Sequence, residues 1–260
     1  MADLHPVLLG TLASALAAVG TAIGASAVFF VHKLDPKVED MLLSSAAGIM
    51  LAATFFSLLL PGLEFGTERF GSEPIAGLVV MAGLAAGALA LWAIHRLVPH
   101  EHFISGPEGP AHPRLGRIWL FVIAVALHNF PEGMAVGVGV AGVGFFGGAA
   151  LTLGIALHSI PEGMAVAVSL VAVGYRKLQA FGVGLLTGLL LPVGGLIGSA
   201  AVWLAAPLLP ATLGFAAGAM LFIISDEIIP ETHRRGFQTI ATFSLLGGFV
   251  LMFLFEATLG

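Results

Sequence analysis

A nine-residue motif appears twice near the middle of the chain: HNFPEGMAV at residues 128–136 and HSIPEGMAV at residues 158–166. Each copy places a histidine and a glutamate four positions apart around a proline, inside an apolar stretch. Ionisable groups inside a membrane span are costly, at about 2.5–3.5 kcal/mol each near the centre of a helix. Two such pairs therefore predict a function, and imidazole combined with carboxylate is typical of a metal site.

The composition is that of an integral membrane protein. Of the 260 residues, 58% are hydrophobic and only 10% are charged, whereas a soluble domain carries about 25% charged residues. The lipid bilayer is thus an expected partner. No basic patch points to nucleic acid. The chain has no cysteine, which excludes disulfides and thiolate metal sites.

Apolar runs of about 20 residues, two of them interrupted by the paired motifs, predict eight transmembrane helices. The expected spans are about residues 7–31, 41–63, 74–95, 117–140, 148–171, 178–204, 210–229 and 239–256. Pro207 and Pro210 predict the turn between the sixth and seventh spans. We expect residues 1–260 to form a single all-α polytopic transmembrane domain, with a histidine-containing cytoplasmic loop at about 97–116.

The basic residues predict the orientation. With eight spans, nine of the ten fall in one set of loops and only Arg69 falls in the other. The nine are Lys33, Lys37, Arg96, Arg114, Arg117, Arg176, Lys177, Arg234 and Arg235. Because basic loops stay in the cytoplasm, both termini are expected outside the cytoplasm, with the protein in the inner (plasma) membrane.

The spacing within each motif predicts a shared site. Positions i and i+4 lie on one helix face, so His128 and Glu132 point the same way, as do His158 and Glu162. The two spans are antiparallel neighbours with a short outer loop, so the motifs can meet at similar depth. Asn129 lies about 100° around its helix and can still reach that cavity. This nitrogen and oxygen set suits Zn²⁺ and other first-row divalent ions.

The prolines also favour a wet cavity. Pro131 and Pro161 leave the carbonyls four residues earlier, those of Leu127 and Leu157, without their helical partner. Such carbonyls are tolerated in a membrane where they line a cavity or find new partners. Two alternatives remain open: a pair of kinked structural helices whose His–Glu pairs satisfy one another, and a duplication without shared function.

At these residues the chain resembles the ZIP (Zrt/Irt-like) family of divalent metal transporters, of the bacterial type. The paired motifs are similar to the family's HNxPEG and HSxPEG patterns. Three other segments also resemble the family: FSLLLPGLE at 56–64, PHEH at 99–102 and SDEIIPETHR at 225–234. The resemblance implies eight helices in the ZIP fold, extracytoplasmic termini and movement of metal into the cytoplasm.

The resemblance also implies roles for particular residues. His128, Glu132, His158 and Glu162 match the ligands of the main transport site. Asn129 and Glu132 match positions beside a second site in binuclear members of the family. There the chain departs from the pattern, because Ser159 stands where those members have aspartate and Leu191 where they have glutamate. Both changes remove anionic oxygen, so we expect one strong metal site.

Outlying polar clusters predict an entrance and an exit path. Ser57 and Glu64 lie at the outer end of the second span, where acidic groups attract cations. On the cytoplasmic side, candidate exit residues are His100, His102, Asp226, Glu227, Glu231 and His233, with Glu101 and His112 nearby. The alternatives are a solvated loop, a hydrophilic linker and a helix-end cluster paired with Arg234 and Arg235.

The leading prediction is a transporter without a cofactor, and not an enzyme. It would move Zn²⁺ into the cytoplasm by alternating access of an elevator type, with Cd²⁺, Fe²⁺ and Mn²⁺ as further candidate substrates. The resemblance implies that the first, fourth, fifth and sixth spans move against the other four. Alternatives are a metal-selective channel with the same ligands, an intramembrane metalloprotease, which lacks its usual HExxH motif, and a metal sensor. A homodimer is compatible with glycine-rich surfaces on the third or eighth span.

Overall fold

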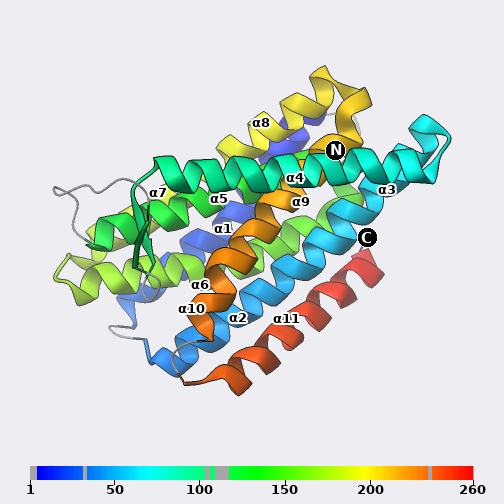
Figure 1. The fold of residues 1–260 in the computed structure, drawn as a ribbon. Coiled ribbons are helices and arrows are strands. Elements are labelled where there is room, and N and C mark those ends of the chain that lie inside the picture. Colours follow the sequence, from blue (N-terminus) through cyan, green and yellow to red (C-terminus); the bar gives the residue numbers. More distant parts are fainter. Residues whose placement is uncertain (1–4, 32–33, 103–105, 109–116, 234–235, 260) are drawn as a thin grey trace.

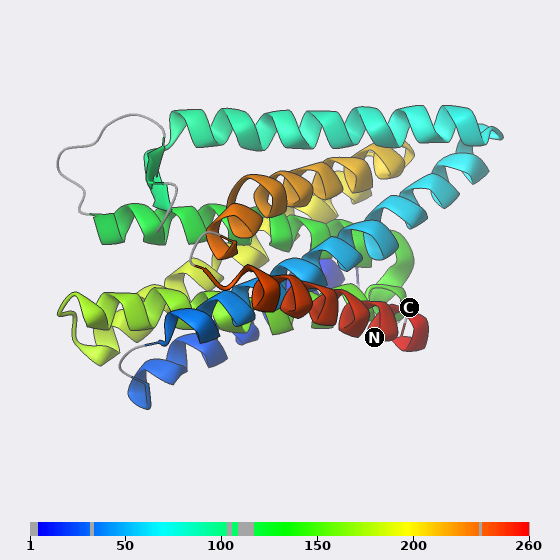
Figure 2. The same ribbon diagram turned by 60° about the horizontal axis from the view of Figure 1, so that its bottom comes forward.

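The computed structural model describes residues 5–31, 34–102, 106–108, 117–233 and 236–259. Within these residues, eight helical segments are long and apolar enough to cross a membrane. They are Pro6–Phe29, Pro36–Phe70, Glu73–Leu97, Ile118–Gly142, Ala149–Ala172, Lys177–Leu204, Ala206–Thr232 and Gln238–Leu259. The all-α fold with eight candidate spans is confirmed. The first and last helices start and finish at the same end of the bundle, as an even number of spans requires (Figures 1 and 2).

Several spans are built from more than one element. The α-helices are α1 (Pro6–Ser26), α2 (Pro36–Ala53), α3 (Leu60–Phe70), α4 (Glu73–Leu97), α5 (Arg117–Gly147), α6 (Ala149–Ala172), α7 (Lys177–Gly188), α8 (Leu190–Leu204), α9 (Leu209–Ile223), α10 (Ile229–Thr232) and α11 (Gln238–Leu259). Short 3₁₀ turns are η1 (Ala27–Phe29) and η3 (Ala206–Leu208), and π-helical turns are η2 (Thr54–Leu59) and η4 (Ile224–Ile228). A small antiparallel hairpin, β1 (His100–His102) with β2 (Gly106–Glu108), lies between α4 and α5.

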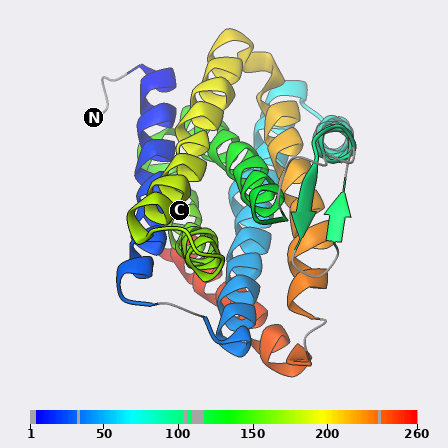
Figure 3. The same cartoon turned by 90° about the vertical axis from the view of Figure 1, so that its left-hand side faces the viewer.

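The helices form two groups by their closest packing. In the first group α1 packs on α6 and on α8, and α5 packs on α8. In the second group α4 packs on α9, and α2 packs on α11. Figure 3 shows α1 and the α6–α8 region on one side of the molecule and α4 with α9 on the other, with α5 and α2 between them. The groups meet chiefly where α2 contacts α6 and α5 contacts α9.

Glycines bring the helices of the first group into backbone contact. A Cβ at Gly20 or Gly24 of α1 would run into the carbonyls of Ala156 or Ile160 on α6. A Cβ at Gly133 of α5 would likewise run into the Leu191 carbonyl of α8. Small residues permit such close approach in membranes, where packing rather than water drives association. The motif helices α5 and α6 are therefore held firmly against α8 and α1.

The second group uses the same device. A Cβ at Gly48 of α2 would meet the Leu245 carbonyl of α11, and one at Gly248 of α11 would meet the Ser45 carbonyl of α2. Gly83 and Gly87 of α4 similarly approach the backbone of α9. In each group, glycines therefore let neighbouring helices pack with their backbones in contact.

The prolines explain two irregular turns. A proline clashes with the carbonyl four residues before it and donates no hydrogen bond. For Pro61 and Pro230 the affected residues are Ser57 and Asp226, which lie in the π-helical turns η2 and η4. A π turn widens the helix by one residue and is often found at functional sites. In η4 this turn carries Glu227, which faces the centre of the molecule.

Candidate metal centre

Three side chains of the paired motifs form a buried ligand group between α5 and α6. They are Glu132 of α5 and His158 and Glu162 of α6, each of which offers a ligand atom within 4.8 Å of the others. The His158 Nε2 atom lies 3.0 Å from Glu132 Oε1. Glu132 and His158 are fully buried, and Glu162 is 5% exposed. Imidazole nitrogen and carboxylate oxygen are both ligands that proteins use to bind Zn²⁺.

Electrostatics favour a cation in this group. Two carboxylates lie in an apolar bundle, and no lysine or arginine forms an ion pair with either of them within the described residues. Burying an uncompensated charge costs several kcal/mol. A divalent cation among Glu132, His158 and Glu162 would neutralise that charge, so the group has the chemistry of a cation site.

A second group lies closer to the end of the bundle where α4 stops and α5 starts. Its members are His95 from the last turn of α4, His128 of α5 and Glu227 of η4. The His128 Nε2 atom lies 2.6 Å from Glu227 Oε2, and the His95 Nε2 atom lies 3.1 Å from Glu227 Oε1. All three side chains are buried. Asp226 is at the rim, half exposed, with a carboxylate oxygen 4.0 Å from His95 Nδ1.

The two motif histidines therefore differ in their surroundings. His158 contacts Glu132 on the neighbouring motif, whereas His128 contacts Glu227 of η4. The sequence predicts that His128 joins Glu132, His158 and Glu162 in a single set. In this structure these four side chains are divided between two adjacent groups.

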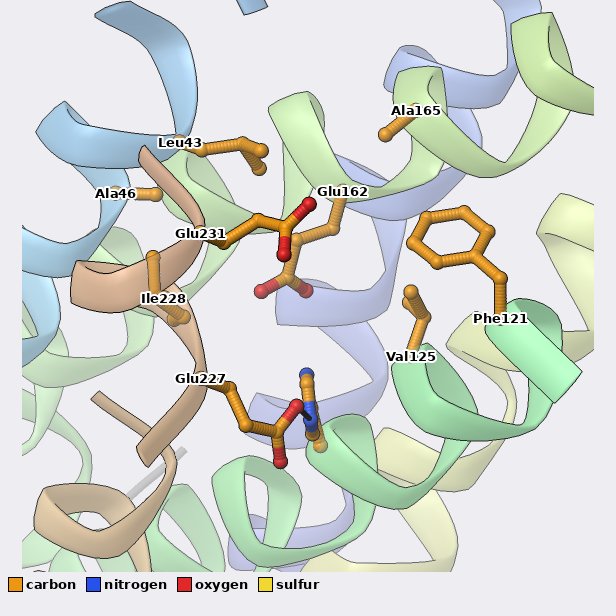
Figure 4. A pocket seen from close by; sticks show the side chains of 10 residues that line it. Leu43, Ala46, Phe121, Val125, Glu162, Ala165, Glu227, Ile228 and Glu231 are labelled. Carbon is orange, nitrogen blue, oxygen red and sulfur yellow. Dashed lines mark ion pairs between the residues drawn. The ribbon is translucent and has the colours of Figure 1, made fainter. Parts of the chain in front are cut away.

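A pocket joins the two groups. It has a volume of about 60 Å³, which is room for a few waters, and its lining includes His128, Glu162, Glu227 and Glu231. Figure 4 shows the carboxylates of Glu162, Glu227 and Glu231 directed into this space. Apolar side chains complete the wall, namely Leu43, Ala46, Phe121, Val125, Ala165 and Ile228. The pocket extends from the buried centre toward the side on which α5 starts and α6 stops.

Around Asn129, the structure offers little support for a second ion. The Asn129 side chain is fully buried, and its amide has no hydrogen-bond partner among the described residues. Ser159 donates its hydroxyl proton to the Ile155 carbonyl of its own helix, at 2.7 Å. Leu191 is buried and offers only hydrocarbon. Of the two polar side chains here, Ser159 is hydrogen-bonded within its own helix and Asn129 has no hydrogen-bond partner among the described residues.

The expected entrance residues lie at the opposite end of the bundle. Ser57 is buried in η2 and donates a hydrogen bond to Glu256 Oε2 of α11, at 2.8 Å. Glu64 is exposed on α3. Neither lines the pocket between the two groups.

The expected exit residues are separated by the structure. Glu227 and Glu231 line the pocket, while His233 lies at the end of α10, with Nδ1 3.0 Å from both the Ile229 carbonyl and the Thr232 hydroxyl. His100, Glu101 and His102 lie in β1, but the structure describes only their backbone. His112, Arg234 and Arg235 lie outside the described residues.

Two side chains at these positions were missed by sequence reasoning. His95 lies in the last turn of α4, beside Arg96, where a basic side chain is ordinary because it interacts favourably with the helix dipole. Glu256 lies in the last turn of the eighth span, α11. The available signal was an ionisable side chain at the edge of an otherwise uncharged span, which is weaker than one at its centre.

Known proteins resemble this chain over nearly its whole length. Residues 100–256 match the family model described as ZIP Zinc transporter. Zinc transporter ZIPB of Bordetella bronchiseptica is 43% identical over 249 residues, covering 96% of this chain and 81% of that protein. Zinc transporter GufA of Myxococcus xanthus is 42% identical over 251 residues, covering 96% and 99%. Human zinc transporter ZIP11 is 32% identical over 320 residues, covering 92% and 94%. This multi-pass membrane protein, with its buried histidine and glutamate groups, belongs to the ZIP zinc transporter family.

Proposed function

We propose that the protein carries Zn²⁺ across the membrane. During transport, Glu132, His158 and Glu162 together bind the ion. The observation that carries this proposal is the buried carboxylate–imidazole–carboxylate group within the paired motif. Family membership supports zinc as the substrate. Transporters of this family are not enzymes, so the metalloprotease alternative is not retained.

The donor set bears on metal preference. Imidazole nitrogen with carboxylate oxygen suits Zn²⁺ and other first-row divalent ions, whereas Ca²⁺ and Mg²⁺ prefer all-oxygen shells. We therefore expect Cd²⁺, Fe²⁺ and Mn²⁺ to compete with Zn²⁺ better than Ca²⁺ or Mg²⁺ does. The ligands must be deprotonated to bind metal, so uptake falls in acid.

The second group extends the proposal to release of the ion. His128, Glu227 and Glu231 border the pocket that extends from Glu162 toward the end of α4. An ion leaving Glu162 would meet Glu227 and His128 next, with His95 behind them. Among the described basic residues, Lys37, Arg96, Arg176 and Lys177 lie at this end of the bundle. The proposed direction is therefore into the cytoplasm, with both termini outside it.

Packing between the helix groups supports a carrier with a moving element. Many glycines within each group face neighbouring backbone, whereas the glycines that face the other group meet side chains. Gly154 of α6 approaches the side chains of Met252 and Ile49, and Gly142 of α5 approaches that of Leu209. Side-chain contacts without interlocked backbones are the easier ones to slide. We propose that α1 and α5–α8 move as one element against α2–α4 and α9–α11, all within a single transmembrane domain.

Uptake into proteoliposomes distinguishes this carrier from a channel. With a zinc-sensitive dye inside, we expect the initial rate to saturate with external zinc, and unlabelled zinc inside to accelerate exchange of isotopic zinc from outside. An ion that crosses by alternating access shows both behaviours. A rate that rises linearly with zinc, with no acceleration by internal zinc, supports the channel instead.

Replacing His95 tests the release step. His95→Ala is expected to lower the uptake rate about 10-fold, a size typical when a partner of a metal site is lost. Glu227→Gln should have a similar effect, and the double variant should be no slower than either single variant because both remove the same group. His233→Ala is the control, since that ring contacts the Ile229 carbonyl and the Thr242 hydroxyl and does not line the pocket. Independent, multiplicative losses in the double variant argue against a shared site.

A further inference from the structure

An apolar groove runs along the outside of the bundle between α1 and α6. Its walls include Leu16 and Ile23 of α1 and Leu153 of α6, its floor includes Ala156, and Leu259 of α11 closes one end. The groove has a volume of about 410 Å³. Leu16 and Ile23 are each 54% exposed, so the groove opens on the surface and is not an internal cavity.

The packing of the two helices creates the hollow. Gly20 of α1 lies against the Ala156 carbonyl of α6, which draws the helices together. Small side chains then line the seam, while Leu16 and Leu153 rise on either side. The single hydroxyl in the lining belongs to Thr152, which donates to the Gly148 carbonyl at 2.8 Å. The lining therefore presents hydrocarbon to whatever occupies it.

The groove lies within two membrane spans, so the bilayer surrounds it. On α6 it extends from Ala149 to Ile160, about 16 Å at 1.5 Å per residue. That length is about half of a 30 Å hydrocarbon core, or one leaflet. An empty groove of this size would forfeit dispersion contacts along its whole lining. It is also far larger than one water, at about 30 Å³, and its lining is almost entirely apolar.

We propose that this groove is a binding site for one acyl chain of a phospholipid, in the leaflet where α6 starts. The chain would lie along α1 and α6 with its contact at Leu259 on α11. Because α1 and α6 belong to one helix group and α11 to the other, the bound chain touches both groups. Neither the binding nor this contact depends on the proposed carrier mechanism.

Native mass spectrometry of the full chain in detergent tests the site. Dioleoyl phosphatidylcholine is added, and the collision energy is raised until loosely bound lipid is stripped. We expect one retained lipid on the parent protein, and loss of that adduct in Ala156→Phe, whose ring fills the groove. Ala149→Phe fills the groove where α6 starts and gives the same result if Ala156→Phe fails to fold. Ala85→Phe adds the same ring to an exposed position on α4 and should retain the lipid.

A lipid with a different headgroup tests whether the groove recognises the acyl chain or the headgroup. Dioleoyl phosphatidylglycerol should be retained equally, because the lining is almost entirely apolar and offers no charged side chain to a headgroup. Retention that depends on the headgroup, or that survives both groove-filling variants, overturns the proposal. So does a dimer that Ala156→Phe abolishes, because a second copy would then be the occupant. Lipid retention is measured without metal and without transport. The result therefore tests lipid binding even if the carrier proposal is wrong.

Discussion

Zinc uptake into proteoliposomes is expected to fall by at least about 100-fold when Glu132 is replaced by glutamine. Loss of an outer-shell partner alone typically costs 10–100-fold in metal affinity, and Glu132 is proposed to bind the ion directly. Glutamine keeps the shape of the side chain but removes the charge that faces His158. The effect should appear in binding as well as in transport, so isothermal titration of the detergent-purified variant provides the second measurement.

The control for this variant removes the same charge elsewhere. Glu73 is exposed in the first turn of α4, and Glu73→Gln should transport zinc at close to the parent rate. Its expected cost is confined to a weak helix-dipole interaction of about 0.3–1 kcal/mol. If Glu132→Gln transports as well as Glu73→Gln does, then the proposed role of Glu132 is wrong.

A second large effect is expected from adding one methyl group beside Glu162. A Cβ at Gly163 would run into the Thr21 carbonyl of α1, and a backbone atom cannot rotate away as a side chain can. Overpacking of this kind costs about 1–3 kcal/mol. Gly163→Ala should therefore separate α6 from α1, shift the adjacent Glu162 and lower the uptake rate together with the unfolding temperature.

The matched control is another helical glycine. Gly182 of α7 has nothing within 4 Å of the position of an added Cβ. Because alanine favours helix over glycine by about 0.5–1 kcal/mol, Gly182→Ala should be neutral or slightly stabilising. Thermal unfolding in detergent and zinc uptake are measured on both variants. Equal behaviour of the two variants contradicts the close packing of α6 on α1.

The fold was largely predictable because the membrane leaves few alternatives. A chain with uncharged runs must satisfy its backbone within each span, which makes helices of about 20 residues the expected unit. The bounds of individual helices were less accessible. The second span continues to Phe70, past Glu64 and Glu68, because a helix does not stop where the membrane does. The π-helical turns before Pro61 and Pro230 depend on local strain that hydropathy does not report.

The pairing of helices was not predictable from hydropathy. Gly20, Gly133 and Gly163 are three of 35 glycines in the chain, and nothing local separates those that face a neighbouring backbone from Gly182, which faces none. In a uniformly apolar helix every face is equally suited to lipid or to protein. The contacts of α1 with α6 and of α4 with α9 therefore emerge only from the three-dimensional structure.

The candidate site likewise has a part that the sequence predicts and a part that depends on helix packing. Glu132, His158 and Glu162 were accessible because they are costly charges at the centre of a span and the motif repeats. The neighbours of His128 were not, since His95 and Glu227 lie far from it in sequence and reach it only through the packing of α4 on α9. A repeated motif predicts that two helices share chemistry, but it does not say which way each histidine turns.

The most direct test of the central claim is a zinc-bound crystal structure with anomalous scattering measured at the zinc absorption edge. We predict a zinc peak bounded by Glu132, His158 and Glu162, with ligand distances of about 2.0–2.2 Å. The Glu132→Gln variant should lose this peak under the same conditions. A peak only among His95, His128 and Glu227, with none beside Glu132 in a protein that transports zinc, would contradict the account.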